Sequence, residues 1–220
     1  MTNFAKHRSI LAQLAKGLFT IPTPRGLQEI YASTLELHVG KVIVIPQPLG
    51  GLRAHSGLQT EADNAKQSLV VDVGFNTFDW LIAKGSRPDM ERSGSFEGGV
   101  SQLIREVSTH AGNELGIGAL DFLDTEKALA TGQLSYKGKV YPFTKYRDIA
   151  DAAATSVVNK FINAQKGNRG FDKIILTGGG AVFFEKALKK RFPSFELNLG
   201  ADAVMDNVRG FYSFGFDLIK

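Results

Sequence analysis

The chain has 220 residues, which is enough for one large domain or two small ones. Its 43% apolar content and a net charge of +4, with scattered Lys and Arg and no basic arm, are typical of a globular protein and argue against direct nucleic-acid binding. The absence of cysteine excludes disulfide and thiolate chemistry and fits a cytoplasmic protein, and no apolar run reaches the ~18 residues of a membrane helix.

The N-terminal part predicts a helix, a loop and a strand. Phe4 to Leu18 places its apolar residues on one face, as an amphipathic helix does, and Gly17 is a plausible end. Residues 21–25 contain two prolines and predict a loop. Residues 29–38 alternate apolar and polar side chains, which predicts a strand that Gly40 breaks.

A second strand is predicted at Lys41–Ile45, where the sequence is apolar and β-branched. Pro46 and Pro48 end it and fix the backbone around Gln47, and a helix or turn follows up to about His55. Nucleotide sites of α/β sheets lie at such strand ends, so Gln47 is a candidate functional residue. The alternative is a surface glutamine after a capped edge strand.

Residues 69–82 predict a β-hairpin with a polar tip, after a polar loop at 56–67. Leu69–Val71 is uniformly apolar, and Phe78, Trp80 and Ile82 alternate along the second strand. Between the two strands lie small and polar residues, including Asp72, Gly74, Asn76 and Thr77. A tip of this composition offers backbone N–H groups, a hydroxyl and a carboxylate, which suit phosphate oxygens and a hydrated Mg²⁺.

Two glycines precede the next helix, whose apolar positions fall on one face between residues 100 and 110. Gly98 and Gly99 allow close backbone approach and predict free N–H groups for an anion at the helix N-terminus. The preceding Glu97 is a candidate contact for a nucleotide ribose. The alternative is a glycine-containing helix start without a ligand.

The middle of the chain predicts structural elements and no site. A short helix at 124–130, a hairpin at 134–141 turning at Lys137–Gly138, and a long helix at 146–164 follow one another. The alanines at 152–154 permit close packing of this last helix against a neighbour.

A glycine run then joins a strand at 171–176 to a helix at 183–192. Gly178, Gly179 and Gly180 leave room for a flat or anionic group, towards which the helix N-terminus points. A returning strand is predicted at 193–199, and a last helix opens at Asp206.

These motifs resemble the actin-like ATPase superfamily, which also contains sugar kinases and heat-shock chaperone ATPases. Asp72, Gly74 and Thr77 match its second phosphate loop, and the glycine run at 178–180 is similar to its adenosine motif. Gln47 stands where members carry the residue that orients the attacking water. Asp79 and the segment Asn207–Phe211 are most similar to the plasmid-segregation (ParM/StbA) branch.

The resemblance implies an α/β fold of the actin-like, ribonuclease H-like type, with a mixed sheet flanked by helices and an N-terminal truncation. Nothing before Gly40 resembles the first phosphate hairpin of the superfamily. Residues 1–55 are therefore expected to be a remnant of the first lobe with the hinge element, and residues 56–220 the second lobe. The chain is either a fragment or a natural short form.

The resemblance also implies a site for ATP or ADP with Mg²⁺. In this site Asp72 holds the ion through its waters, and Gln47 orients the attacking water. The phosphates contact Gly74, Asn76 and Thr77, and adenosine contacts Gly178–Gly180. With half of the phosphate clamp, weak or absent binding and turnover are expected from this chain alone. Filament subunits are the implied partners, with DNA reached only through an adaptor.

Three functions remain open from the sequence. The first is a cytomotive ATPase of plasmid partition, whole or trimmed. The second is a short actin-like subunit that caps or regulates a filament partner without hydrolysis, and the third is a small-molecule kinase of the same superfamily. Loss of the first lobe also predicts exposed apolar surface and self-association, for example over Phe4, Leu11 and Leu14.

Overall fold

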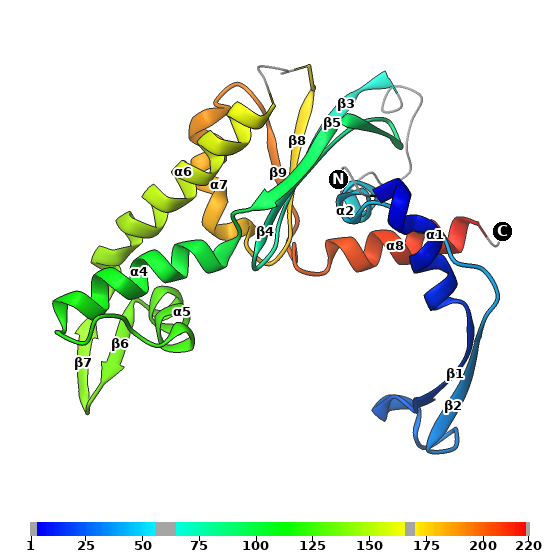
Figure 1. The fold of residues 1–220 in the computed structure, drawn as a ribbon, viewed down its shortest axis with the longest axis horizontal. Coiled ribbons are helices and arrows are strands. Elements are labelled where there is room, and N and C mark those ends of the chain that lie inside the picture. The colour runs from blue at the N-terminus through cyan, green and yellow to red at the C-terminus, as the bar shows by residue number, and fades with distance from the viewer. Residues whose placement is uncertain (1–3, 56–64, 166–169, 219–220) are drawn as a thin grey trace. The chain divides into compact units, whose positions relative to one another are not determined.

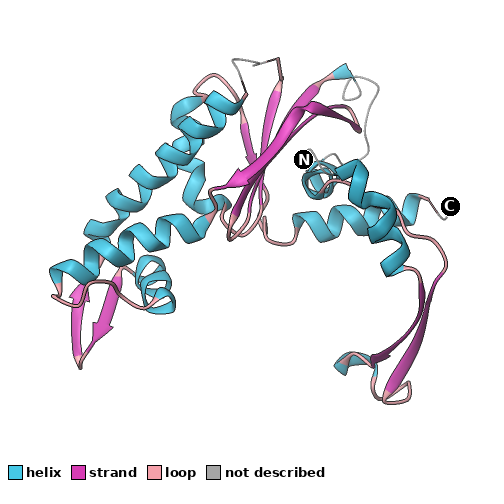
Figure 2. Cartoon of the chain, viewed as in Figure 1, coloured by secondary structure: helices cyan, strands magenta, loops and turns pink. Residues whose placement is uncertain are grey.

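The computed structural model describes residues 4–55, 65–165 and 170–218. The chain forms two compact units, Met1–Pro46 and Gln47–Lys220. Figure 1 shows the elements of both units, and Figure 2 separates helices from strands.

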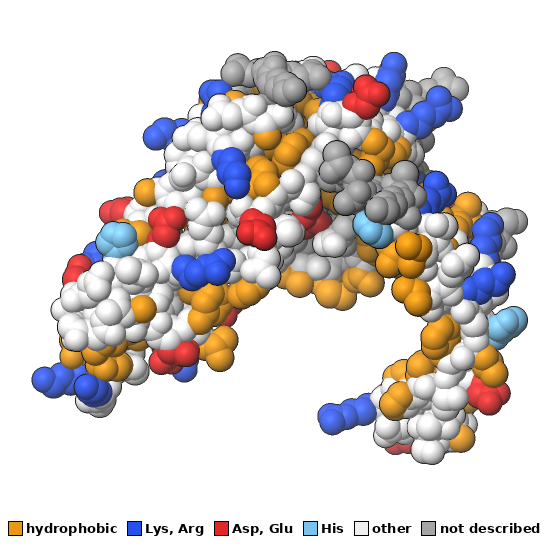
Figure 3. All heavy atoms as spheres, in the orientation of Figure 1, with side chains coloured by type: hydrophobic (Ala, Val, Ile, Leu, Met, Phe, Trp, Pro, Cys, Tyr) orange, Lys and Arg blue, Asp and Glu red, His pale blue; other side chains and the backbone are white. Residues whose placement is uncertain are grey.

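The first unit contains a helix and a hairpin. Helix α1 spans Phe4–Ala15, and strands β1 (Gly17–Pro22) and β2 (Thr34–Val39) pair antiparallel, with the 3-10 helix η1 (Arg25–Leu27) between them. The predicted helix therefore ends before Gly17, because residues 17–22 join the hairpin instead. Many apolar side chains of this unit are exposed (Figure 3), among them Ile10, Leu11, Leu14, Leu18, Phe19, Ile30 and Leu37.

The predicted strand at Lys41–Ile45 is not formed. Residues 40–46 have no assigned secondary structure, and the side chain of Ile43 is 38% exposed. A strand requires a hydrogen-bonded neighbour, and within the described part of this unit the only ladder joins β1 to β2. The sequence prediction was wrong here because β-branched residues favour a strand only where a partner strand is present.

The second unit is built on a five-stranded mixed sheet with the order β5-β4-β3-β8-β9. Strands β3 (Gln67–Val73), β4 (Thr77–Lys84) and β5 (Arg87–Glu97) run antiparallel to one another. Strands β8 (Lys173–Thr177) and β9 (Leu197–Leu199) continue parallel to β3. The predicted mixed α/β fold is confirmed, as is the hairpin at its centre. Most of the predicted loop at 56–67 lies outside the described residues.

Helices cover both faces of this sheet (Figure 1). Helices α4 (Val100–Glu114), α6 (Arg147–Ala164) and α7 (Ala181–Arg191) pack on one face, and α2 (Gln47–His55) lies with α8 (Asp206–Asp217) on the other. Helix α5 (Phe122–Thr131) and the hairpin β6 (Gln133–Tyr136) and β7 (Lys139–Pro142) lie beyond α4. None of the helices described here is long and apolar enough to cross a membrane.

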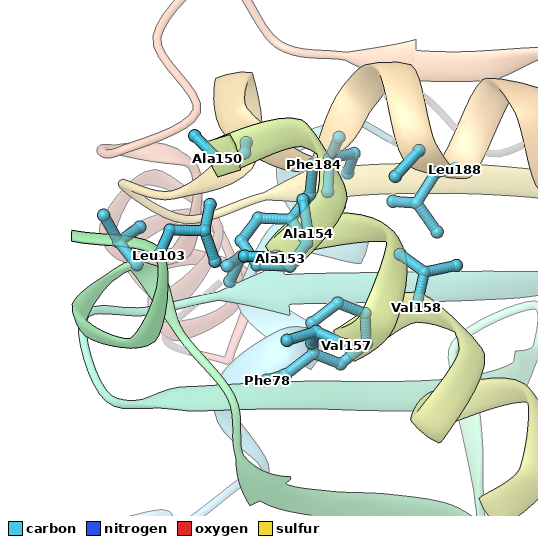
Figure 4. Packing of buried hydrophobic residues seen from close by; sticks show 14 of the residues in the cluster. Phe78, Leu103, Ala150, Ala153, Ala154, Val157, Val158, Phe184 and Leu188 are labelled. Atoms are coloured by element: carbon cyan, nitrogen blue, oxygen red, sulfur yellow. The ribbon is translucent and has the colours of Figure 1, made fainter. Parts of the chain in front are cut away.

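The core lies between the sheet and α4, α6 and α7. Phe78 of β4 is fully buried, and its ring lies 5.3 Å from that of Phe161 and 5.6 Å from that of Phe184. Figure 4 shows Phe78 beside Val157, with the alanines of α6 between the helices. The small side chains of Ala153 and Ala154 allow α6 to approach the sheet closely, as the alanine-rich stretch predicted.

Helices α2 and α8 cross at glycines. A Cβ atom added to Gly210 would lie 1.8 Å from the carbonyl oxygen of Gly50, so the two backbones are in direct contact. The imidazole Nε2 of His55 lies 2.8 Å from a carboxylate oxygen of Asp206, and Arg53 pairs with Asp217. The glycine crossing therefore fixes α8 against α2, and with it the residues at the start of α8.

Candidate functional site

The tip of the β3–β4 hairpin is bonded to the start of α4. The Gly74 N–H donates to the carbonyl of Thr77 at 2.9 Å. The N–H groups of Gly98 and Gly99 both donate to the carbonyl of Asn76, at 3.0 and 3.1 Å. The prediction of free N–H groups at Gly98 and Gly99 is therefore wrong, because the hairpin tip itself caps the helix. The close approach was predicted correctly, since a Cβ on Gly99 would lie 2.4 Å from the Gly74 oxygen.

The polar side chains of the tip are at the surface. Asn76 and Thr77 are exposed, and the Thr77 hydroxyl donates to a carboxylate oxygen of Asp79 at 2.7 Å. Asp79 lies directly opposite Asp72 in the antiparallel ladder, so the two carboxylates belong to the same face of the sheet. Glu97 is exposed at the end of β5, and its carbonyl accepts a hydrogen bond from Lys160.

Asp72 is the buried acid of this site, with 1% of its surface exposed. Its Oδ2 accepts a hydrogen bond of 2.8 Å from the Asn207 side chain, and its Oδ1 has no partner among the described residues. Burial raises the pKa of Asp72 and the charge of Asp79 adds to the rise, while the hydrogen bonds of Asn207 and Gln47 oppose it. The carboxylate is costly to keep ionised here, which favours a positive group near Oδ1.

The glycine run packs directly against Asp72. Gly178 has a φ of +89°, and a Cβ there would lie 2.5 Å from the Asp72 Oδ1. Gly180 is equally crowded, because its added Cβ would lie 2.6 Å from Val73 and its N–H donates to the Val73 carbonyl. Gly179 is exposed, and a Cβ added there would have a single ordinary contact, with the Val204 side chain at 4.0 Å. The three glycines therefore differ: Gly178 and Gly180 are required for packing, and Gly179 faces solvent.

Gln47 is the first residue of α2 and is exposed. Its side chain reaches the Asp72 carboxylate closely enough to oppose the rise in the pKa of Asp72. The structure thus brings together Gln47, Asp72 and the glycine run, which come from three separate parts of the sequence. All lie near the ends of the parallel strands β3 and β8, which is where α/β sheets bind nucleotides.

Asn207 belongs to this site, although the sequence points to it only as the first residue of the closing segment Asn207–Phe211 and not as a site residue. Its Nδ2 donates to Asp72, and its Oδ1 accepts from the Gly51 N–H at 2.9 Å. One side chain therefore connects α8, the end of β3 and the backbone of α2. The resemblance of that segment does not reveal a side-chain partner as distant in the chain as Asp72.

The arrangement suits a cation that keeps its waters. The described residues contain no group of three or more His, Cys, Asp or Glu side chains that would enclose a metal ion. A single buried carboxylate with an unpartnered oxygen fits Mg²⁺, which binds proteins through one or two carboxylates, water and phosphate oxygens. Asp72 is the residue that would hold it.

A mixed sheet with this hairpin, this glycine run and helix α2 is the arrangement of the actin-like ATPase fold. Ta0583, an archaeal actin homologue, is similar in structure with a TM-score of 0.82 and 19% identity, over 99% of this chain and 68% of Ta0583. Its ADP complex gives a TM-score of 0.75 at 19% identity, over 92% and 64% of the two chains. A 15-stranded ParM filament from Clostridium botulinum gives 0.74 at 19% identity, over 99% and 64%.

Residues 70–190 match the family model of archaeal actin homologues of the MreB-like type, C-terminal part, and the chain belongs to this family. The predicted membership of the actin-like superfamily is thereby confirmed, and ParM is among the similar folds. The chain spans about two thirds of the length of these solved structures. No curated protein matches it.

Proposed function

We propose that this chain supplies the nucleotide-binding second lobe of an actin-like filament protein of plasmid segregation. The observation that carries the proposal is the contact between the buried Asp72 and the glycine run, beside Gln47. Residues 56–220 would form the second lobe, and residues 1–55 would provide the hinge and part of the first lobe.

Each site residue has a proposed role that follows from its position. Asp72 would hold Mg²⁺ through water, and the exposed Asn76 and Thr77 would meet the phosphates with Gly74. Gly179 would contact adenosine, because it is the glycine of the run with free space. Gln47, an amide, would orient water without acting as a strong base.

The ligand would be ATP or ADP. Ta0583, which shares this fold, has been solved in complex with ADP. We expect weak binding and little or no turnover by this chain alone, because phosphoryl transfer depends on holding the phosphates from both sides. The other strand pair near the N-terminus, β1–β2, has no Asp-x-Gly sequence at its turn and offers no second phosphate loop.

Filament assembly in the cytoplasm, with plasmid DNA reached through an adaptor, would be the cellular role. The ParM filament from Clostridium botulinum has a similar fold. A second candidate is a short subunit that caps a filament partner without hydrolysis. The exposed apolar side chains of the first unit, such as Leu14 at 72%, favour it, because a surface of this kind usually finds a partner.

Titration calorimetry with ADP and Mg²⁺ tests the nucleotide site. Gly179→Val fills the space left for adenosine, and the open surroundings of Gly179 should preserve folding. Gly26→Val is the matched control, since that glycine is also unobstructed and lies in the first unit. We expect heat of binding in the parent and Gly26→Val proteins and at least a tenfold weaker affinity in Gly179→Val. Equal affinities in all three would contradict the proposal.

A further inference from the structure

Strand β5 bulges away from β4 in the middle of the sheet. Trp80 pairs with Gly94 and Ile82 pairs with Asp89, so residues 90–93 lie opposite Leu81 alone. Bulges of this kind re-aim side chains and often lie beside binding sites. Next to this bulge is a cavity of about 300 Å³, lined by Trp80, Ile82, Glu91, Arg92, Ser93, Ala164 and Gln165.

Two residues of the cavity lining, Arg92 and Gln165, each carry a buried hydrogen-bond donor that has no partner among the described residues. These donors are the Nε of Arg92 and the Nε2 of Gln165, and both atoms are buried. Gln165 is only 8% exposed as a whole. A buried donor left unpaired costs about 1–3 kcal/mol, so two such donors on residues of one cavity favour a bound acceptor there.

The rest of the Arg92 side chain is held in place. Its Nη1 donates to the Gln67 side chain at 3.1 Å and its Nη2 to the Gly170 carbonyl at 3.1 Å. The Arg92 carbonyl accepts from the indole N–H of Trp80 at 3.0 Å. The guanidinium is therefore held by two other segments of the chain and the backbone of Arg92 by a third, and Nε is the side-chain nitrogen that remains for a ligand.

We propose that this cavity binds a small neutral molecule that carries a carbonyl or amide oxygen beside an apolar ring or chain. The oxygen would accept from Arg92 and Gln165, and the apolar part would pack on Trp80 and Ile82. The ligand is neutral because the charge of Arg92 is already offset: Asp89 lies 3.7 Å from its Nη1, and Glu91 adds a second carboxylate to the lining.

The site is independent of the proposed nucleotide site. Trp80 pairs with Val71, and both belong to the face of the sheet that packs on α4, α6 and α7. Asp72 is the next residue along β3, and its side chain belongs to the opposite face. A ligand in this cavity would therefore contact neither Asp72 nor the glycine run.

The cavity contains its own reporter, because Trp80 is the single tryptophan of the chain and is 6% exposed. We would titrate the full chain with benzamide, benzoate and toluene, which share a ring and differ in the acceptor, and follow the fluorescence of Trp80 with excitation at the red edge. Benzamide should give a saturable change with a dissociation constant on the order of millimolar. Benzoate and toluene should bind at least several-fold more weakly.

Two variants test the donors. Arg92→Lys keeps the charge and loses Nε, and Gln165→Met keeps the size and loses the amide; each should weaken benzamide on the order of tenfold. Arg87→Lys, on the exposed start of β5, and Gln133→Met, on the exposed start of β6, are the matched controls and should leave the affinity unchanged.

Three results would overturn the inference. Absence of a saturable benzamide response would show that the cavity holds water only. Equal binding of toluene would show an apolar cavity without a role for the donors, and tighter binding of benzoate would show an anion site. If Arg92→Lys fails to fold, Gln165→Met alone decides, because Gln165 directly follows α6 and its Nε2 has no hydrogen-bond partner to lose among the described residues.

Discussion

Replacement of Gly210 by alanine should strongly destabilise the second unit, although alanine is the better helix former. The added Cβ would lie 1.8 Å from the Gly50 carbonyl oxygen, so α8 must move away from α2 by more than an ångström. That movement also strains the hydrogen bond between the Gly51 N–H and Asn207. Overpacking of about 3 kcal/mol against a propensity gain of about 1 kcal/mol leaves a net loss of about 2 kcal/mol.

Gly215→Ala is the matched control, because Gly215 lies in the same helix with no atom near its added Cβ. It should raise stability by about 0.5–1 kcal/mol through helix propensity alone. Thermal unfolding should therefore show a midpoint about 4–8 °C lower for Gly210→Ala and about 1–4 °C higher for Gly215→Ala. Shifts of the same sign in both variants would refute a backbone crossing at Gly210.

Three other variants test the site and the core. Burial raises the pKa of Asp72 in the folded protein. This carboxyl therefore contributes stability below its unfolded pKa, and that stability is lost as the pH rises through its folded pKa. Urea unfolding at several pH values should show this loss in the parent protein and not in Asp72→Asn. Asn207→Asp places two carboxylates 2.8 Å apart and should lower the free energy of unfolding by about 3 kcal/mol. In a double-mutant cycle, Asp72→Asn in the same chain should restore most of this loss. Phe78→Ala should lower the unfolding free energy by about 3–5 kcal/mol in chemical denaturation, because its ring is fully enclosed.

The central hairpin and most helices could be predicted from local pattern. Two strands are predicted by the apolar run Leu69–Val71 and by the alternation of Phe78, Trp80 and Ile82, because these patterns are those of strands buried in a sheet. The structure has these strands as β3 and β4. The strand at Lys41–Ile45 was predicted equally well by residue type, yet it has no partner in the described chain and stays unpaired. Whether a strand finds a hydrogen-bonded neighbour depends on the whole fold and cannot be predicted from residue type alone.

Within the site, the sequence likewise does not determine which individual hydrogen bonds form. The resemblance to the actin-like superfamily implies that Asp72, the tip and the glycine run form one site, but it does not say which backbone N–H groups remain free. The N–H groups of Gly98 and Gly99 are used by Asn76, and Gly178 serves the packing of Asp72. Asn207 was missed because its partner is 135 residues away in the chain.

Amide chemical shifts of the full chain during titration with Mg²⁺ and ADP test directly whether a nucleotide binds at Asp72 and the glycine run. We expect the largest perturbations at Gly179 and at the tip residues Asn76 and Thr77, and smaller ones at Gly51, which Asn207 connects to Asp72. Perturbations confined to other parts of the chain, or none up to several millimolar ADP, would contradict a nucleotide site at Asp72 and the glycine run.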